Sequence, residues 1–166
     1  PLYFSWLLHW QARLCRNLLA LQRLIEEHLF WIALYSRWQY TDQNWQVNKQ
    51  AIFGGLPPII RDIVAHSWRK KIKRQILGHG TGRHQADEVF ALGRQDLDAL
   101  SASLGNQLYF LGDEPTTLDS SAFGLLINII GCPIESPLKK YGLTKDNLVS
   151  YVERIQHEYY SDLSTR

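Results

Sequence analysis

Apolar residues recur at steps of three and four over a long stretch near the start of the chain. They fall at Leu14, Leu18, Leu21, Ile25, Leu29, Ile32 and Tyr35. This spacing puts them on one face of an α-helix and predicts one long helix over residues 11–40, about 45 Å in length. We expect this helix to be the longest element and to support the rest of the domain.

Glycine and proline divide the remaining sequence into further helical segments. A helix is predicted from the prolines at 57 and 58 to about residue 78, where a glycine-rich hinge ends it. Its expected inner face consists of Ile59, Ile60, Ile63, Val64, Trp68, Ile72 and Ile76. Apolar periodicity predicts three more helices, over residues 86–104, from 116 to about 130, and from 146 onward. Because no stretch alternates as a strand does, the predicted fold class is an all-α helical bundle.

Composition and charge narrow the class of protein. The 166 residues are 45% hydrophobic and 20% charged, which favours a packed core over disorder. The net charge of +2 does not indicate nucleic acid as a partner. The longest apolar run, residues 122–132, is interrupted by Asn128 and is too short for a transmembrane segment. We therefore expect a soluble chain.

The residues that could bind metal or react as thiols form no recognisable site. Cys15 and Cys132 lie among apolar residues without a CxxC motif, and the six histidines form no ligand set such as HExxH. We expect no metal, inert thiols and a reducing, cytoplasmic location. One basic cluster, residues 69–74, is interpreted as a solvated helix end, with an acidic lipid surface or nucleic acid as the alternatives.

Thr116 and Asp119 have the spacing of an N-terminal capping box. A threonine hydroxyl at the cap accepts from the backbone N–H three residues on, and an acidic side chain at that position bonds back to the threonine N–H. We interpret the pair as a structural device that starts the fourth predicted helix.

Six segments, in order, resemble the C-terminal helical domain of glutathione S-transferases, in the branch of failed axon connections and the metaxins. They are residues 26–31 (EEHLFW), 53–57 (FGGLP), 80–84 (GTGRH), 92–97 (LGRQDL), 110–119 (FLGDEPTTLD) and 133–138 (PIESPL). The resemblance covers residues 11–166, whereas residues 1–10 do not match and are interpreted as a remnant of something upstream. It implies the all-α fold already predicted.

The resemblance also implies a partner domain. In this family an N-terminal thioredoxin-like domain binds glutathione and carries the activating Tyr, Ser or Cys. No βαβ pattern precedes residue 11, so we expect that domain, and every catalytic residue, to be missing from this chain. The helical domain ordinarily supplies a wall of the pocket for a hydrophobic electrophile and part of a homodimer interface.

The candidate pocket residues lie in the second half of the long helix. Trp31, Tyr35 and Trp38 are spaced four and three apart and share one face, which makes them either a wall for the electrophile or ordinary core. Arg37 is a candidate for a glutathione carboxylate, with a surface ion pair as the alternative. We expect the parent protein to conjugate glutathione as a co-substrate. The alternative function is a non-catalytic, metaxin-like adaptor or protein-interaction domain.

Overall fold

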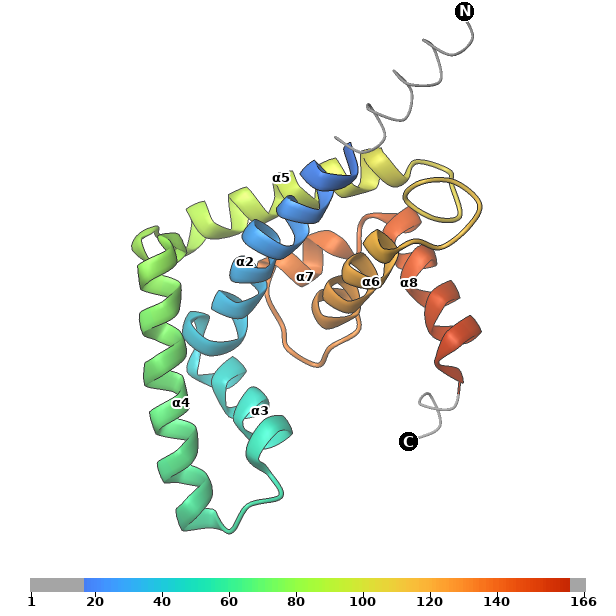
Figure 1. Ribbon diagram of the computed structural model, residues 1–166. Coiled ribbons are helices and arrows are strands. Elements are labelled where there is room, and N and C mark those ends of the chain that lie inside the picture. Colours follow the sequence, from blue (N-terminus) through green and yellow to red (C-terminus); the bar gives the residue numbers. More distant parts are fainter. Residues whose placement is uncertain (1–16, 162–166) are drawn as a thin grey trace, which may run out of the picture.

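Residues 17–161 are described by the computed structural model, and the regular elements in that part of the chain are all helical (Figure 1). The closest approach to a strand among them is an isolated antiparallel bridge between Tyr109 and Gly112. The all-α prediction is confirmed.

The long first helix is continuous from residue 17 to residue 40, but its turns are not uniform. A π-helical stretch, η1 (Leu24–Leu29), is followed by α2 (Phe30–Tyr35) and a second π-helical stretch, η2 (Ser36–Tyr40). The predicted stripe is buried at Ile25, Leu29, Ile32 and Tyr35. Leu14 and the predicted residues 11–16 of this helix lie outside the described residues.

Helix α3 (Asp42–Phe53) has no counterpart in the sequence-based prediction. Thr41 starts it in an extended conformation, and its side chain accepts a hydrogen bond from the Asn44 backbone N–H at 3.1 Å. Asn44 and Asn48 are both buried, and the Asn44 amide donates to the backbone oxygens of Ser36 and Glu135. Two of the four buried residues of α3 are asparagines, and the other two, Trp45 and Phe53, are eight residues apart, so apolar periodicity does not reveal this helix.

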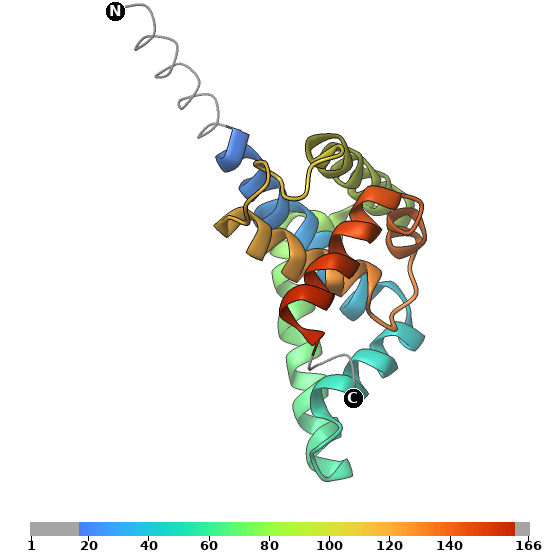
Figure 2. The ribbon, with the colours of Figure 1, turned by 90° about the vertical axis from the view of Figure 1, so that its right-hand side faces the viewer.

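Helix α4 (Pro58–His79) forms as predicted, but the predicted inner face is wrong over its first half. Ile76 is fully buried, and Val64 and Ile72 pack against the core, whereas Trp68 is exposed. The exposed fractions of Ile59, Ile60 and Ile63 are 77%, 52% and 67%. Figures 1 and 2 show the reason: the α3–α4 hairpin projects beyond the body of the domain, where none of the other helices within residues 17–161 covers it.

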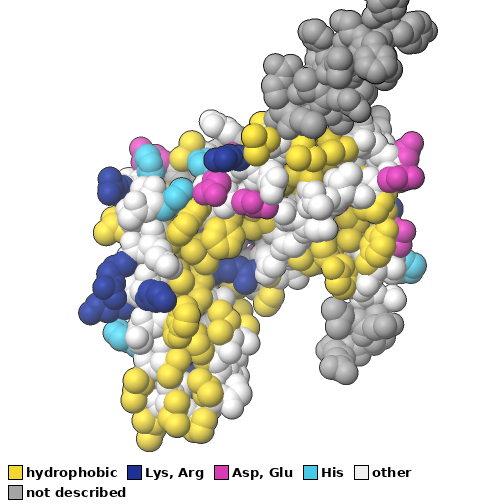
Figure 3. All heavy atoms as spheres, in the orientation of Figure 1, with side chains coloured by type: hydrophobic (Ala, Val, Ile, Leu, Met, Phe, Trp, Pro, Cys, Tyr) yellow, Lys and Arg dark blue, Asp and Glu magenta, His cyan; other side chains and the backbone are white. Residues whose placement is uncertain are grey.

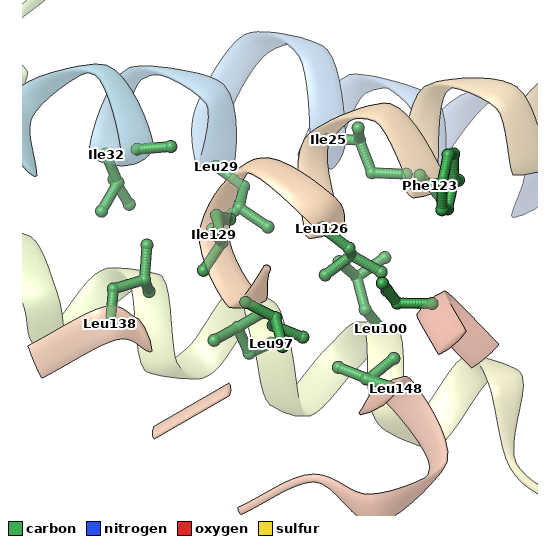
Figure 4. Close-up of a cluster of buried hydrophobic side chains, with 14 of the residues drawn as sticks. Ile25, Leu29, Ile32, Leu97, Leu100, Phe123, Leu126, Ile129, Leu138 and Leu148 are labelled. Atoms are coloured by element: carbon green, nitrogen blue, oxygen red, sulfur yellow. The ribbon is translucent and has the colours of Figure 1, made fainter. Parts of the chain in front are cut away.

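The core lies between the first helix and the four helices that end the chain (Figure 4). The short turn η3 (Thr81–Arg83) leads into α5 (Ala86–Leu104), which has the predicted bounds. Then follow α6 (Thr117–Ile130), the unpredicted α7 (Pro137–Gly142) and α8 (Asp146–Tyr159). A Cβ on Gly93 would lie 2.6 Å from Leu138 Cδ1 and 3.0 Å from Ile32 Cγ2, so glycine lets α5 approach α2 and α7 closely.

A polar contact also joins the first helix to α5. His28 Nδ1 lies 2.6 Å from Asp96 Oδ2, and Asp96 is buried. Burial raises the pKa of the Asp96 carboxyl above its usual range, against the opposing effect of His28. The hydrogen bond satisfies a carboxyl that would otherwise be buried without a partner.

The predicted capping box at the start of α6 is present, and Asp119 makes more bonds than the box requires. Its Oδ2 accepts from the Thr116 backbone N–H and from the Thr116 hydroxyl, both at 2.9 Å. Its Oδ1 accepts from the Phe110 backbone N–H at 3.0 Å and from the Tyr151 hydroxyl at 3.1 Å. Asp119 therefore connects α6 to the loop before it and to α8.

Tyr151 is suited to remain the donor in this network. Burial, followed by the Asp119 charge and hydrogen bond, raises the pKa of the Tyr151 hydroxyl well above its usual range. The tyrosine keeps its proton through the physiological pH range, and this one proton is shared between Asp119 Oδ1 and the Asp119 backbone oxygen, both 3.1 Å from the hydroxyl.

We predict that Asp119→Ala lowers the free energy of unfolding by about 3 kcal/mol or more, because it removes a cap and leaves buried donors without an acceptor. Glu88→Ala is the matched control: Glu88 forms a capping box with Gln85 at the start of α5, but it is exposed. Its loss should cost about 1 kcal/mol or less. Urea unfolding measures both, and equal losses would contradict a special role for Asp119.

Candidate functional site

A cavity of about 380 Å3 lies between the first helix, α3 and α6. Most of its lining is apolar. The lining residues are Ile25, Glu26, Phe30, Ala33, Leu34, Arg37, Trp38, Asn48, Ile52, Ser121, Gly124, Leu125 and Asn128. An apolar cavity of this size with a few polar groups is typical of a small-molecule site.

Both π-helical stretches contribute to this cavity. Ile25 and Glu26 belong to η1, and Arg37 and Trp38 belong to η2. Wide turns of this kind inside helices occur frequently at functional sites. The first helix therefore departs from regular geometry in two segments that both face the cavity.

Arg37 is anchored to the far end of α6. Its Nη2 donates to the backbone oxygen of Asn128 at 2.6 Å and to Asn128 Oδ1 at 2.9 Å. The Asn128 amide in turn donates to the Gly124 backbone oxygen at 2.8 Å. Among residues 17–161, no acidic side chain pairs with Arg37, so its remaining N–H groups are available to an anionic ligand group.

Glu26 places a carboxylate in the same cavity. Glu26 Oε1 accepts from the Ser121 hydroxyl at 2.8 Å and from the Gln22 amide at 3.2 Å. Eleven residues separate Glu26 from Arg37 along the first helix, a distance of about 16 Å. The cavity thus carries a negative charge toward the start of this helix and a positive charge toward its end.

Asn48 is the polar residue whose bonding is incomplete. Only 2% of it is exposed, and its Nδ2 has no hydrogen-bond partner among the described residues. A buried amide without a partner is rare in proteins and is costly to stability. Its place in the cavity lining favours a ligand with a hydrogen-bond acceptor.

The structure separates the candidate residues that the sequence placed on one face. Arg37 and Trp38 line the cavity together. Tyr35 is buried with its ring edge-on to Phe90 of α5, and Trp31 stacks on the His79 ring with centroids 4.5 Å apart. Because the turns of η2 contain more than 3.6 residues, Trp38 falls out of phase with the other two aromatic residues.

Sequence reasoning missed several residues of the cavity. Asn128 had a usable signal, since it interrupts an otherwise apolar run. Glu26 and Asn48 had none, because a single polar residue on a helix does not reveal whether it faces solvent or a cavity.

Metal binding, membrane crossing and thiol reactivity find no supporting arrangement in the described part of the chain. Within residues 17–161, no group of three or more His, Cys, Asp or Glu side chains is placed to hold a metal ion. No helix there combines the length and the apolar character that crossing a membrane requires. Cys132 is half-buried with its thiol directed at the Ile129 and Ile134 backbone oxygens, and Cys15 lies outside the described residues.

Comparisons with known proteins identify the domain. Residues 93–155 match the family model of the glutathione S-transferase C-terminal domain. The isoprene-epoxide–glutathione S-transferase of Rhodococcus sp. (strain AD45) is 36% identical over 144 residues, which cover 85% of this chain and 60% of that protein. Failed axon connections of Drosophila melanogaster is 34% identical over 151 residues, covering 84% of this chain and 36% of that protein.

Human metaxin-2 is also related, at 27% identity over 144 residues that cover 86% of this chain and 55% of metaxin-2. No solved structure matches the chain at a significant level. The chain spans about 60% or less of the length of these relatives. It carries a C-terminal helical domain of the glutathione S-transferase family, in the branch that also contains failed axon connections and the metaxins.

Proposed function

We propose that this domain forms the acceptor-substrate side of a glutathione-conjugating protein. The observation that carries the proposal is the apolar cavity of about 380 Å3, whose lining includes Asn48, a residue with a buried amide nitrogen that has no partner among the described residues. A relative at 36% identity is named for conjugating an epoxide. The substrate class that fits both facts is a small hydrophobic electrophile with an oxygen acceptor.

The chemistry divides between this chain and a thioredoxin-like domain that we propose as its partner. That domain would hold glutathione and stabilise its thiolate, since a free thiol is largely protonated at neutral pH. The sulfur attacks a carbon of the epoxide and the C–O bond breaks, which leaves negative charge on the oxygen. We assign the Asn48 amide as the donor for that oxygen, which requires the amide to turn toward the cavity that Asn48 lines, and Phe30, Leu34 and Leu125 would enclose the apolar part of the substrate.

A second candidate function is a non-catalytic adaptor of the metaxin kind. Human metaxin-2 matches over a similar share of this chain, and α4 exposes isoleucines that a contact surface would use. The homodimer and the cytoplasmic location expected from the sequence stay predictions under either function.

A conjugation assay separates the two functions. We predict that the full-length protein accelerates the reaction of glutathione with a small epoxide, and that the isolated 166-residue chain does not. The isolated chain should also show no saturable glutathione binding by calorimetry, because we assign thiol activation to the partner domain. Turnover by the isolated chain would contradict this division of roles, and inactivity of the full-length protein would favour the adaptor.

Gly124→Leu tests the cavity itself. A Cβ on Gly124 would meet no atom within 4 Å, so a larger side chain can fill the cavity without displacing α6. We expect it to weaken the binding of the apolar anionic probe anilinonaphthalene sulfonate by about tenfold or more, because roughly 1.4 kcal/mol or more of apolar burial is lost.

Gly78→Leu is the matched control. Gly78 is an exposed helical glycine of α4 with equally open space around its Cβ, and it does not line the cavity. Both variants gain helix propensity, and fluorescence titration compares their affinities. Equal affinity of the two variants would show that the probe binds elsewhere.

A further inference from the structure

The outward face of α4 has two halves of different character. Ile59, Ile63, His66, Lys70, Lys73 and Leu77 follow one another at alternating steps of four and three, so they form a single stripe along the helix. All of them are exposed. The stripe is apolar where α4 begins and basic where it approaches its end.

The apolar half belongs to a projecting apolar tip, which consists of Leu56, Ile59, Ile60 and Ile63. These side chains leave the α3–α4 hairpin over a wide arc of the helix, so the surface that they form is convex. Figure 3 shows hydrophobic atoms covering the lower end of α3 and α4, at the point farthest from the body of the domain. Exposed isoleucines in such number are unusual on a surface that stays in water.

The basic half of the stripe, with two cations beside it, forms a basic band that consists of Lys70, Lys71, Lys73 and Arg74. Figure 3 shows Lys and Arg side chains gathered along the outer edge of α4. None of them forms an ion pair with a described residue. Lys70, Lys73 and Arg74 border a hollow of about 510 Å3 beside η2 and η3. The helix continues to His79, so the band precedes the last turn, where a helix dipole would account for it.

Arg69, next to the basic band, is a cation with a structural role. Its Nη2 donates to Asp42 Oδ1 at 2.9 Å, its Nε donates to the Trp38 backbone oxygen, and its guanidinium lies over the Trp45 ring. Arg69 therefore fastens α4 to η2 and α3. The cations of the basic band form no comparable hydrogen bond or ion pair with another helix of the described chain.

We propose that the α3–α4 hairpin docks on the surface of an anionic phospholipid bilayer, with the apolar tip inserted and the basic band at the lipid phosphates. A convex tip requires a deformable apolar medium to surround it, which a bilayer provides. About 10 Å along the helix axis separate Ile63 from Lys70. That distance matches an apolar face buried 5–10 Å into the boundary between headgroups and acyl chains.

Charges beside the tip limit its depth. Asp62 pairs with Lys49 at 2.8 Å and with Arg61 at 3.4 Å, so a compensated cluster lies next to the inserted isoleucines. Trp68 is exposed at a level of α4 between the tip and the basic band, on a different side of the helix from the stripe, and the Lys71 ammonium lies 4.9 Å from its ring centroid. Tryptophan with a flanking cation is the combination favoured at the headgroup level.

A second copy of the chain is a poorer occupant of this surface. Two α4 stripes aligned in the same direction bring the basic bands into mutual repulsion. Aligned in opposite directions along their full length, they place isoleucines against lysines. An acidic membrane complements both halves at once. The binding free energy from inserting the apolar tip adds to the attraction between the basic band and the anionic lipids.

Vesicle flotation at low salt tests the proposal. The chain should bind phosphatidylcholine vesicles that contain phosphatidylserine, bind pure phosphatidylcholine vesicles far more weakly, and dissociate as salt is raised. Lys70→Glu with Lys73→Glu should lower the partition coefficient on acidic vesicles by about 30-fold or more, at about 1 kcal/mol for each lost cation. Ile59→Asp with Ile63→Asp should lower it by a similar factor on the same vesicles.

Matched controls use exposed residues elsewhere in the domain. Arg23→Glu with Lys140→Glu makes the same change in net charge, and Leu19→Asp with Leu143→Asp makes the same change in apolar surface. Both pairs lie away from the α3–α4 hairpin, so they should change the partition coefficient by less than about threefold, which corresponds to ~0.6 kcal/mol.

Equal binding to neutral and acidic vesicles, or full binding by the tip variant, would overturn the proposal. So would sedimentation that shows a dimer abolished by the tip variant without any lipid binding, which would assign the tip to a second copy. Capture of an acidic protein segment in place of vesicles would likewise overturn it.

Discussion

The carboxylate of Asp119 is the constraint on which the rest of this helical domain depends. It is 3% exposed, and both of its oxygens are occupied by donors from three parts of the chain: the α6 cap, the Phe110 loop and Tyr151 of α8. A buried charge is tolerated only when hydrogen bonds replace its hydration, and here four of them do. The same bonds fix where α6 begins and how it lies against α8.

The position of α6 determines the cavity. Ser121, Gly124 and Asn128 recur along one side of α6, and they face the two π-helical stretches of the first helix. Arg37 and Glu26 each reach across to this side of α6, at Asn128 and Ser121 respectively. Helix α6, which Asp119 positions, therefore also supplies one wall of the cavity.

Helix bounds and caps that depend on local sequence pattern can be predicted from the sequence. The burial of a helix face and the phase of its side chains depend on tertiary contacts and cannot. The bounds of α5 and the Thr116–Asp119 box follow from apolar spacing and cap chemistry, and both are confirmed. The burial of Ile59 and Ile63 was predicted wrongly, because periodicity marks an apolar face but does not say whether anything covers it. The separation of Trp38 from Trp31 depends on π-helical turns, which leave no signal in residue spacing. Helix α3 escapes prediction because Asn44 and Asn48 take two of its four buried positions and interrupt the apolar pattern.

Native-state hydrogen exchange measures the Asp119 network most directly. If this carboxylate organises the domain, the backbone N–H groups of Phe110 and Thr116 exchange only through global unfolding, as slowly as the core amides of α5. The Gln85 N–H, bonded to the exposed Glu88, should exchange faster through local fraying. Exchange of the Phe110 and Thr116 amides at the rate of Gln85 would show that the start of α6 opens independently and would contradict the account.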